Sequence, residues 1–325
     1  MYNGFLLFQV ISIMNSESSF RFVQLSDIHI GSAYSYHFKP AWVENFKQCL
    51  HQLKNLNPQP EFIVITGDLT RDGNTHLWEL RAVLEWLNEL PYKIYTIPGN
   101  HDVGGRPETA KESRLTQKSL SHFLSVFKKD HFEFEYKGVQ FIGLNSFLFA
   151  SKTVAEEEQW LWLESLKSKC IRENRRSFWF MHTLPFWRNP FEEFETVPRF
   201  DTTDGYRLTD HASQLRLMKM LQECKADFVA NGHTHSYLDR TVDGIRQITC
   251  PSTAFLTEET DTLGFLVYDV SPTNVIATMH PLEKASDIVG FGGGIVNIGQ
   301  RDYSLAQKTS AEITKEIQEL KAQHS

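Results

Sequence analysis

The stretch FRFVQLSDIH, residues 20–29, decides the fold class of this 325-residue chain. Its first six residues are rich in aromatic and β-branched side chains and favour a strand, and polar residues of metal-binding type follow at once. Short runs of the same kind recur at residues 62–66, 93–97, 139–144, 178–181 and 228–230. Stretches with apolar residues at helical spacing lie between them, at residues 42–56, 76–90, 115–127, 156–169 and 213–224. This alternation predicts a layered α/β fold with helices over the sheet faces.

After residue 230 the pattern changes to short strands. They are expected at residues 237–242, 245–249, 263–270 and 275–279. Asp243-Gly244 is a good two-residue hairpin turn between the first two of them. We therefore expect a second, largely antiparallel sheet that faces the first. The predicted fold is a four-layer α/β/β/α sandwich with two mixed sheets and a metal site at the carboxyl ends of strands.

The domain organisation is simple, because no internal repeat or low-complexity linker divides residues 20–282. Residues 1–19 are expected to be an N-terminal extension, either an extra strand or a dispensable segment upstream of a start at Met14. Residues 5–14 are apolar, but a secretory signal would have a preceding Lys or Arg and a small-residue cleavage site. Residues 283–325 are expected to form a tail with a Gly-rich loop and a polar helix.

The composition is that of an ordinary globular protein, with 41% hydrophobic and 22% charged residues. The formal net charge is −7 and no block of Lys or Arg stands out, so we expect no general binding to DNA or RNA. The four cysteines lie far apart and form no CxxC pair, which is typical of reduced thiols in a cytoplasmic protein. No stretch approaches the ~20 apolar residues of a membrane span.

Polar residues of metal-binding type follow five of the predicted strands. The motifs are Asp-x-His at residues 27–29, Gly-Asp at residues 67–68, Gly-Asn-His-Asp at residues 99–102, a single His182, and Gly-His-x-His at residues 232–235. Each motif alone is as well explained by a turn or by a structural histidine. Open α/β sheets bind ligands at the carboxyl ends of their strands, so rigid strands can bring all five motifs together. Their shared position therefore favours a metal site.

The candidate ligands form a mixed oxygen and nitrogen set without sulfur. They are Asp27, His29, Asp68, Asn100, His182, His233 and His235. Such a set suits Mn, Fe, Zn or Co better than Ca or Cu(I). The set is too large for one catalytic ion that keeps open positions, and it suits two divalent ions with Asp68 as the bridging carboxylate. Two-metal sites stabilise the attacking and leaving oxygens of a phosphoryl displacement.

The order of these motifs resembles that of the calcineurin-like metallophosphoesterases, over about residues 20–279. Within that superfamily, residues 67–73 and 250–265 resemble the class III branch of bacterial cyclic-nucleotide phosphodiesterases. Residues 143–146 and 158–160 are similar to that branch too, and also to small calcineurin-like phosphoesterase-domain phosphatases. The resemblance therefore leaves the substrate open.

The resemblance implies roles for individual residues. One metal would take Asp27, His29, Asp68 and His235. The other would take Asp68, Asn100, His182 and His233. His101 is similar to the family's histidine that contacts the phosphate and protonates the leaving oxygen, and Asp102 would orient it. The family often has His-His-Pro-Pro where residues 182–185 read His-Thr-Leu-Pro, so the ligand position is kept while the second His and the first Pro are replaced.

The predicted activity is hydrolysis of a small phosphate diester, with cyclic nucleotides among the candidates, by attack of metal-bound hydroxide on phosphorus. A phosphomonoesterase or protein phosphatase is the alternative, and a non-catalytic scaffold is disfavoured because all seven ligand positions are filled. In the long loop at residues 187–208 and just before it, Phe186, Trp187 and Tyr206 would either stack on the substrate or pack the loop. The sequence leaves open the metal, the oligomeric state and the roles of loop and tail.

Overall fold

The structure of the chain is a computed structural model that describes residues 19–31, 35, 38–105, 115–192, 209–257 and 261–286. The N-terminal extension up to residue 18, most of the 187–208 loop with Tyr206, and the predicted tail helix lie outside these residues. Within them, no helix has the length and apolar character needed to cross a membrane. All four cysteines are buried free thiols.

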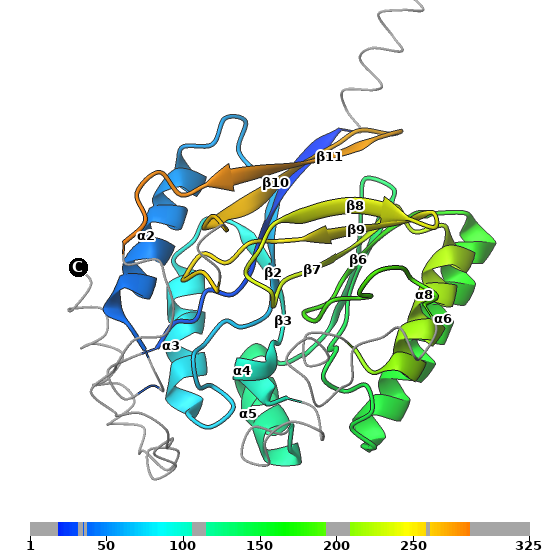
Figure 1. Ribbon diagram of the computed structural model, residues 1–325, viewed down its shortest axis with the longest axis horizontal. Coiled ribbons are helices and arrows are strands. Elements are labelled where there is room, and N and C mark those ends of the chain that lie inside the picture. Colours follow the sequence, from blue (N-terminus) through cyan, green and yellow to red (C-terminus); the bar gives the residue numbers. More distant parts are fainter. Residues whose placement is uncertain are drawn as a thin grey trace, which may run out of the picture.

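Two mixed β-sheets form the centre of the molecule (Figure 1). The first has the strand order β11-β10-β1-β2-β3. Its strands are β1 (Phe20–Leu25), β2 (Phe62–Thr66), β3 (Lys93–Ile97), β10 (Gly264–Val270) and β11 (Val275–Pro281). The second has the order β4-β5-β6-β7-β9-β8. Its strands are β4 (Phe132–Tyr136), β5 (Val139–Gly143), β6 (Arg176–Phe180), β7 (Phe228–Asn231), β8 (Leu238–Val242) and β9 (Ile245–Thr249).

Helices cover the outer face of each sheet, which confirms the predicted four layers (Figure 1). Three helices pack on the first sheet: α2 (Pro40–Lys54), α3 (Leu77–Asn88) and α5 (Gln117–Phe127). Two cover the second: α6 (Val154–Glu173) and α8 (His211–Cys224). The short helix α4 (Asn100–Val103) lies at a strand end.

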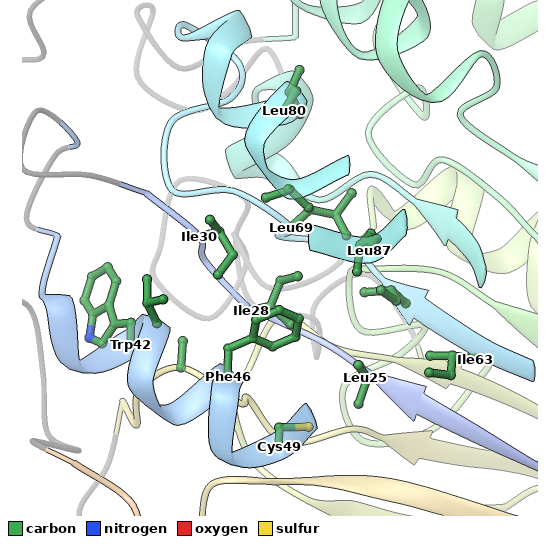
Figure 2. Packing of buried hydrophobic residues seen from close by; sticks show 14 of the residues in the cluster. Leu25, Ile28, Ile30, Trp42, Phe46, Cys49, Ile63, Leu69, Leu80 and Leu87 are labelled. Carbon is green, nitrogen blue, oxygen red and sulfur yellow. The ribbon is translucent and has the colours of Figure 1, made fainter. Parts of the chain in front are cut away.

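The cluster under α2 shows how these layers are joined. Figure 2 shows Phe46 of α2 beside Ile28 and Cys49 near Leu25, where the chain leads from β1 into the first motif, while Trp42 lies nearer the start of the same helix. All five side chains are fully buried. Since each large apolar side chain contributes about 1.5–3 kcal/mol when buried, this packing fixes the end of β1 firmly.

Aromatic rings fill the space between the two sheets. Phe22 of β1 stacks on Tyr268 of β10 with ring centroids 4.4 Å apart, and its ring edge meets Phe141 of β5 at 5.3 Å. The buried Gln24 adds a polar link, because its Nε2 donates to the Asn231 carbonyl of β7 at 3.2 Å and its Oε1 accepts from the Tyr268 hydroxyl at 2.6 Å. These contacts fix one sheet relative to the other and therefore fix their strand ends.

The late strands are arranged differently from our prediction. We expected residues after 230 to build a separate, largely antiparallel sheet. Instead, β9 pairs in parallel with β7 and brings the β8–β9 hairpin into the second sheet, while β10 pairs antiparallel with β1 in the first. The prediction was wrong because these pairings join residues far apart in sequence. The turn at Asp243-Gly244 is confirmed, with φ of 48° and 78° at the two residues.

Candidate metal centre

Five of the seven candidate ligands have a left-handed backbone, which is uncommon for residues other than glycine. They are Asp27 (φ 53°), His29 (φ 43°), Asp68 (φ 50°), His233 (φ 72°) and His235 (φ 61°). Each such residue costs on the order of 1–3 kcal/mol, and surrounding structure must compensate. The backbone of the tight turns after β1, β2 and β7 is therefore strained, and this strained conformation sets the direction of the ligand side chains. Such backbone strain is characteristic of functional sites.

The first group of side chains comes from both sheets. His29 Nε2 lies 3.6 Å from Asp68 Oδ2 and 3.3 Å from His235 Nε2. His235 Nε2 in turn lies 3.3 Å from Asp27 Oδ1. All four side chains are buried. Two imidazole nitrogens and two carboxylates thus converge on one small volume, and they belong to the four residues that the resemblance assigns to one metal.

The second group shares Asp68 with the first. His182 Nε2 lies 3.4 Å from Asp68 Oδ2, and His233 Nδ1 lies 3.1 Å from His182 Nε2. Asn100 begins α4 directly before His101, whose N donates to Asp68 Oδ1, and among the described residues none donates a hydrogen bond to the buried Asn100 Oδ1. A buried acceptor without a donor is costly unless a cation or water satisfies it. These observations fit a second cation bound by this second group, with Asp68 as the ligand that the two groups share.

Hydrogen bonds on the far side of two histidine rings fix which nitrogen faces the site. His182 Nδ1 lies 2.6 Å from the Thr66 carbonyl oxygen, and His235 Nδ1 lies 2.7 Å from the Phe255 carbonyl oxygen. A carbonyl can only accept, so Nδ1 carries a proton and Nε2 is the nitrogen that faces the site. This arrangement is the usual support of metal-binding histidines.

The charges of the metal-free groups also suit cations. Burial alone would raise the pKa of Asp27, but the charge of His235 and its hydrogen bond, with the charge of His182, lower that pKa to about 2. Burial alone would lower the pKa of His182, but the charge of Asp68 and its hydrogen bond raise that pKa to about 9. In the metal-free site the ionised carboxylates therefore stabilise a proton on His182, and a divalent cation would displace that proton on binding.

Glycine 99 lets two motifs approach closely. A Cβ built on Gly99 would lie 2.1 Å from Asp68 Oδ1 and 2.3 Å from Asp68 N. His101 N donates to Asp68 Oδ1 at 2.9 Å across the same contact. The glycine of the Gly-Asn-His-Asp motif is thus required by space, because the carboxylate shared by both groups occupies the position of its side chain.

His101 lies at the edge of the site, and its orientation has a different cause from the one predicted. Its Nδ1 is 2.7 Å from the Arg71 carbonyl oxygen, so that carbonyl orients the ring. The buried Asp102 carboxylate, predicted to do so, accepts instead from Leu69 N, from Thr70 N and Oγ1, and from Gly99 N. Asp102 therefore acts on His101 through the backbone, by fixing the loop that carries Arg71. Burial and the charge of Asp68 raise the pKa of Asp102 to about 7.

Sequence analysis did not single out Arg71 as a site residue. Its guanidinium NH1 lies 3.3 Å from His101 Nε2, and its side chain is buried under the Trp42 ring, 5.4 Å from the ring centroid. A charged residue three positions after Asp68 was the only sequence signal, and it is equally typical of a solvated turn.

The predicted aromatic loop is only partly described. Phe186 is fully buried beneath the Arg240 guanidinium, 5.0 Å from its ring centroid, and Arg240 also donates to the Trp187 carbonyl. Phe186 therefore packs the loop onto β8. Where the family often has a second histidine, the Thr183 hydroxyl is 2.8 Å from that of Thr209 and is buried.

Residues 20–237 match the family model described as calcineurin-like phosphoesterase. The chain therefore belongs to the calcineurin-like phosphoesterase family, whose dimetal enzymes use two metal ions, and it has candidate ligand groups for them.

Its relatives include different kinds of phosphoester hydrolase. The chain is 26% identical to the serine/threonine-protein phosphatase CPPED1 of Danio rerio, over 75% of this chain and 76% of that protein. It is 28% identical to a probable glycerophosphodiester phosphodiesterase, GpdQ, of Arcobacter nitrofigilis, over 50% of this chain and 56% of the relative. The fold is similar to the crystal structure of a dimetal phosphatase from Danio rerio, with a TM-score of 0.55 and 14% identity over 81% of this chain and 96% of that one.

Proposed function

We propose that this chain hydrolyses phosphate esters with two divalent metal ions held by the two groups of side chains that share Asp68. The observation that carries the proposal is the convergence of both groups on Asp68 Oδ2, 3.6 Å from His29 Nε2 and 3.4 Å from His182 Nε2. One carboxylate oxygen within reach of two separate sets of imidazoles suits a bridging ligand.

The metal ions would polarise the phosphoryl oxygens and activate water as the nucleophile. The protein would supply the rest. The lone pairs of His182 and His235 are fixed by their backbone hydrogen bonds. By the family resemblance, His101 would donate a proton to the departing ester oxygen, and its Nε2 is 4.0 Å from Asp68 Oδ2. Mn, Fe, Zn and Co are the candidate ions.

Two substrate classes are candidates. A small phosphate diester remains our first, because the motifs at residues 67–73 and 250–265 resemble those of cyclic-nucleotide phosphodiesterases and a relative is a probable glycerophosphodiesterase. A phosphate monoester is the second, because the protein phosphatase relative matches three quarters of this chain and the diesterase only half. A cytoplasmic location remains a prediction.

A panel of esters tests this proposal. Purified protein supplied with each candidate metal would be assayed on bis(p-nitrophenyl) phosphate, p-nitrophenyl phosphate and 3′,5′-cyclic nucleotides. We expect turnover that a chelator abolishes. Cleavage of the monoester alone would refute the diesterase assignment, and no cleavage with any metal would refute the proposed function.

A pair of matched variants tests the bridging role. Asp68→Asn keeps the size of the side chain but loses its charge, so we expect it to lose bound metal and more than about 100-fold in activity. Asp243→Asn makes the same chemical change at the turn between β8 and β9, and should have no effect. Full metal content and activity in Asp68→Asn would rule out the bridging role.

A further inference from the structure

Arg71 places a permanent positive charge beside the candidate metal centre. Its NH1 is 3.3 Å from His101 Nε2, and that nitrogen is 4.0 Å from Asp68 Oδ2. A guanidinium does not lose its proton in proteins, so the charge is present at every working pH. The Arg71 guanidinium has no role in the ester hydrolysis proposed above.

The backbone of Arg71 is fixed on two sides. Its N–H donates to the Ile30 carbonyl at 3.0 Å, and its carbonyl accepts from His101 Nδ1 at 2.7 Å. The next residue is fixed too, because Asp72 N donates to the buried Glu79 carboxylate at 2.6 Å. The side chain is covered by the face of Trp42 and is only 2% exposed. The guanidinium is thus held in place before any ligand arrives, so little ordering remains to be done on binding.

The charge distribution favours a particular phosphoryl group. Two divalent ions would outweigh the charges of Asp27 and Asp68, and Arg71 adds a further positive charge in a buried place where charges are poorly screened. A phosphate monoester carries about −1.5 to −2 charges at neutral pH, whereas a diester carries one. A guanidinium also presents several N–H donors that match phosphoryl oxygens. A phosphoryl group bound beside Arg71 would therefore be stabilised more as a monoester than as a diester.

We propose that Arg71 binds the phosphoryl group and gives the site a second activity, hydrolysis of the monoester that the diester reaction produces. The inference rests on the proposed phosphoester hydrolysis. In the first step, water forms a P–O bond as the bond to one alcohol breaks, giving an alcohol, a monoester and a proton. In the second, another water displaces the remaining alcohol, which takes up a proton, and inorganic phosphate is released. Each step consumes one water and involves no change of oxidation state.

The products of a symmetric diester report on both steps. Mn²⁺-loaded wild type and Arg71→Gln would be incubated with bis(p-nitrophenyl) phosphate, and p-nitrophenol, p-nitrophenyl phosphate and phosphate would be quantified. We expect wild type to release both p-nitrophenol groups and free phosphate, while Arg71→Gln accumulates p-nitrophenyl phosphate. Its kcat/KM for the monoester should fall about 10- to 100-fold more than that for the diester, as expected for lost charge-assisted hydrogen bonds.

Phosphate binding gives a readout that does not depend on turnover. Isothermal titration of inorganic phosphate into the Mn²⁺-loaded proteins should show about 10-fold or greater weakening in Arg71→Gln, with unchanged metal content. Arg71→Lys keeps the charge but not the fork of donors, so its affinity should be intermediate, and it serves if the glutamine variant does not fold. Arg216→Gln is the matched control, because Arg216 binds Glu164 on the surface of α6 at 3.2 Å. It should behave as wild type.

Different failures have different meanings. A folded Arg71→Gln variant with wild-type phosphate affinity and an unchanged ratio of monoester to diester cleavage would overturn the inference alone. A wild type that cleaves the diester but never releases phosphate would also overturn it. If wild type cleaves neither ester with any metal, the proposed function fails, and unchanged phosphate affinity in the variants would then refute Arg71 as a phosphate ligand as well.

Discussion

The tight contact at Gly99 allows a sharp test of how the site is built. Gly99 has φ −103° and ψ −177°, a backbone conformation that any residue can adopt. An alanine there is therefore disfavoured only by the steric clash of its Cβ. Its Cβ would lie 2.3 Å from Asp68 N and 2.1 Å from Asp68 Oδ1. Since ordinary contacts begin at 3.4 Å, the backbone of Asp68 would have to move by about 1 Å.

Two effects of Gly99→Ala follow from that displacement. Overpacking costs about 1–3 kcal/mol, and we expect the upper end because the obstacle is backbone. At about 2 °C per kcal/mol for a domain of this size, the metal-free protein should melt about 6 °C lower. Metal ligands tolerate shifts of only about 0.2 Å, so bound metal should be lost. A misplacement of about 1 Å should cost roughly 100-fold in kcat/KM.

The assay compares Gly99→Ala with Gly138→Ala by calorimetry of the metal-free proteins, elemental analysis and ester hydrolysis. Gly138 lies in the turn between β4 and β5 with φ 79°, and nothing is within 4 Å of its added Cβ. Its alanine variant should lose about 1–2 kcal/mol through backbone strain and keep full activity. If Gly99→Ala retained wild-type metal content and kcat/KM, the close approach of the two motifs would not be what positions Asp68.

Three further predictions concern buried polar groups. Asp102→Asn should destabilise the protein by about 2–4 kcal/mol in urea unfolding, because an amide cannot accept from all four donors around the carboxylate; an unchanged midpoint would contradict this. Tyr268→Phe removes the hydroxyl that donates to Gln24 and should cost about 1–2 kcal/mol, with activity retained once folded. Burial raises the pKa of Glu79, so the folded state binds its proton more tightly than the unfolded state does. The stability of wild type relative to Glu79→Gln should therefore fall as pH rises above about 4.5, and a pH-independent difference would count against it.

Much of the fold could be predicted because its central strands have a strong local signal. The bounds of β1, β2 and β3 coincide with the predicted ranges, since each is a short run rich in β-branched and aromatic residues that ends at a polar motif or proline. Strand β4, with its alternating Phe and Glu, was missed; it lies at a sheet edge, where charged side chains are common. The sheet assignment of the late strands depends on pairing between distant residues and could not be predicted locally.

The candidate site, like the fold, could be predicted only in part. Strand ends of parallel sheets meet, so spacing and residue type were enough to bring Asp27, Asp68 and His182 together in prediction. The contacts of Asp102 and Arg71 depend instead on the direction in which side chains leave a tight loop. A sequence motif indicates which residues share a loop, but not which neighbour each carboxylate or guanidinium reaches.

The division of the proposed ligands between the two sheets has a consequence for unfolding. Asp27 and Asp68 follow strands of the first sheet, whereas His182, His233 and His235 follow strands of the second. Each ion would then be a cross-link between two halves of the domain that is absent from the unfolded chain. Resistance to heat should rise with free metal concentration, by about 2.7 kcal/mol at 100 times the dissociation constant of one site. Amide hydrogen exchange at the facing strands should slow in parallel.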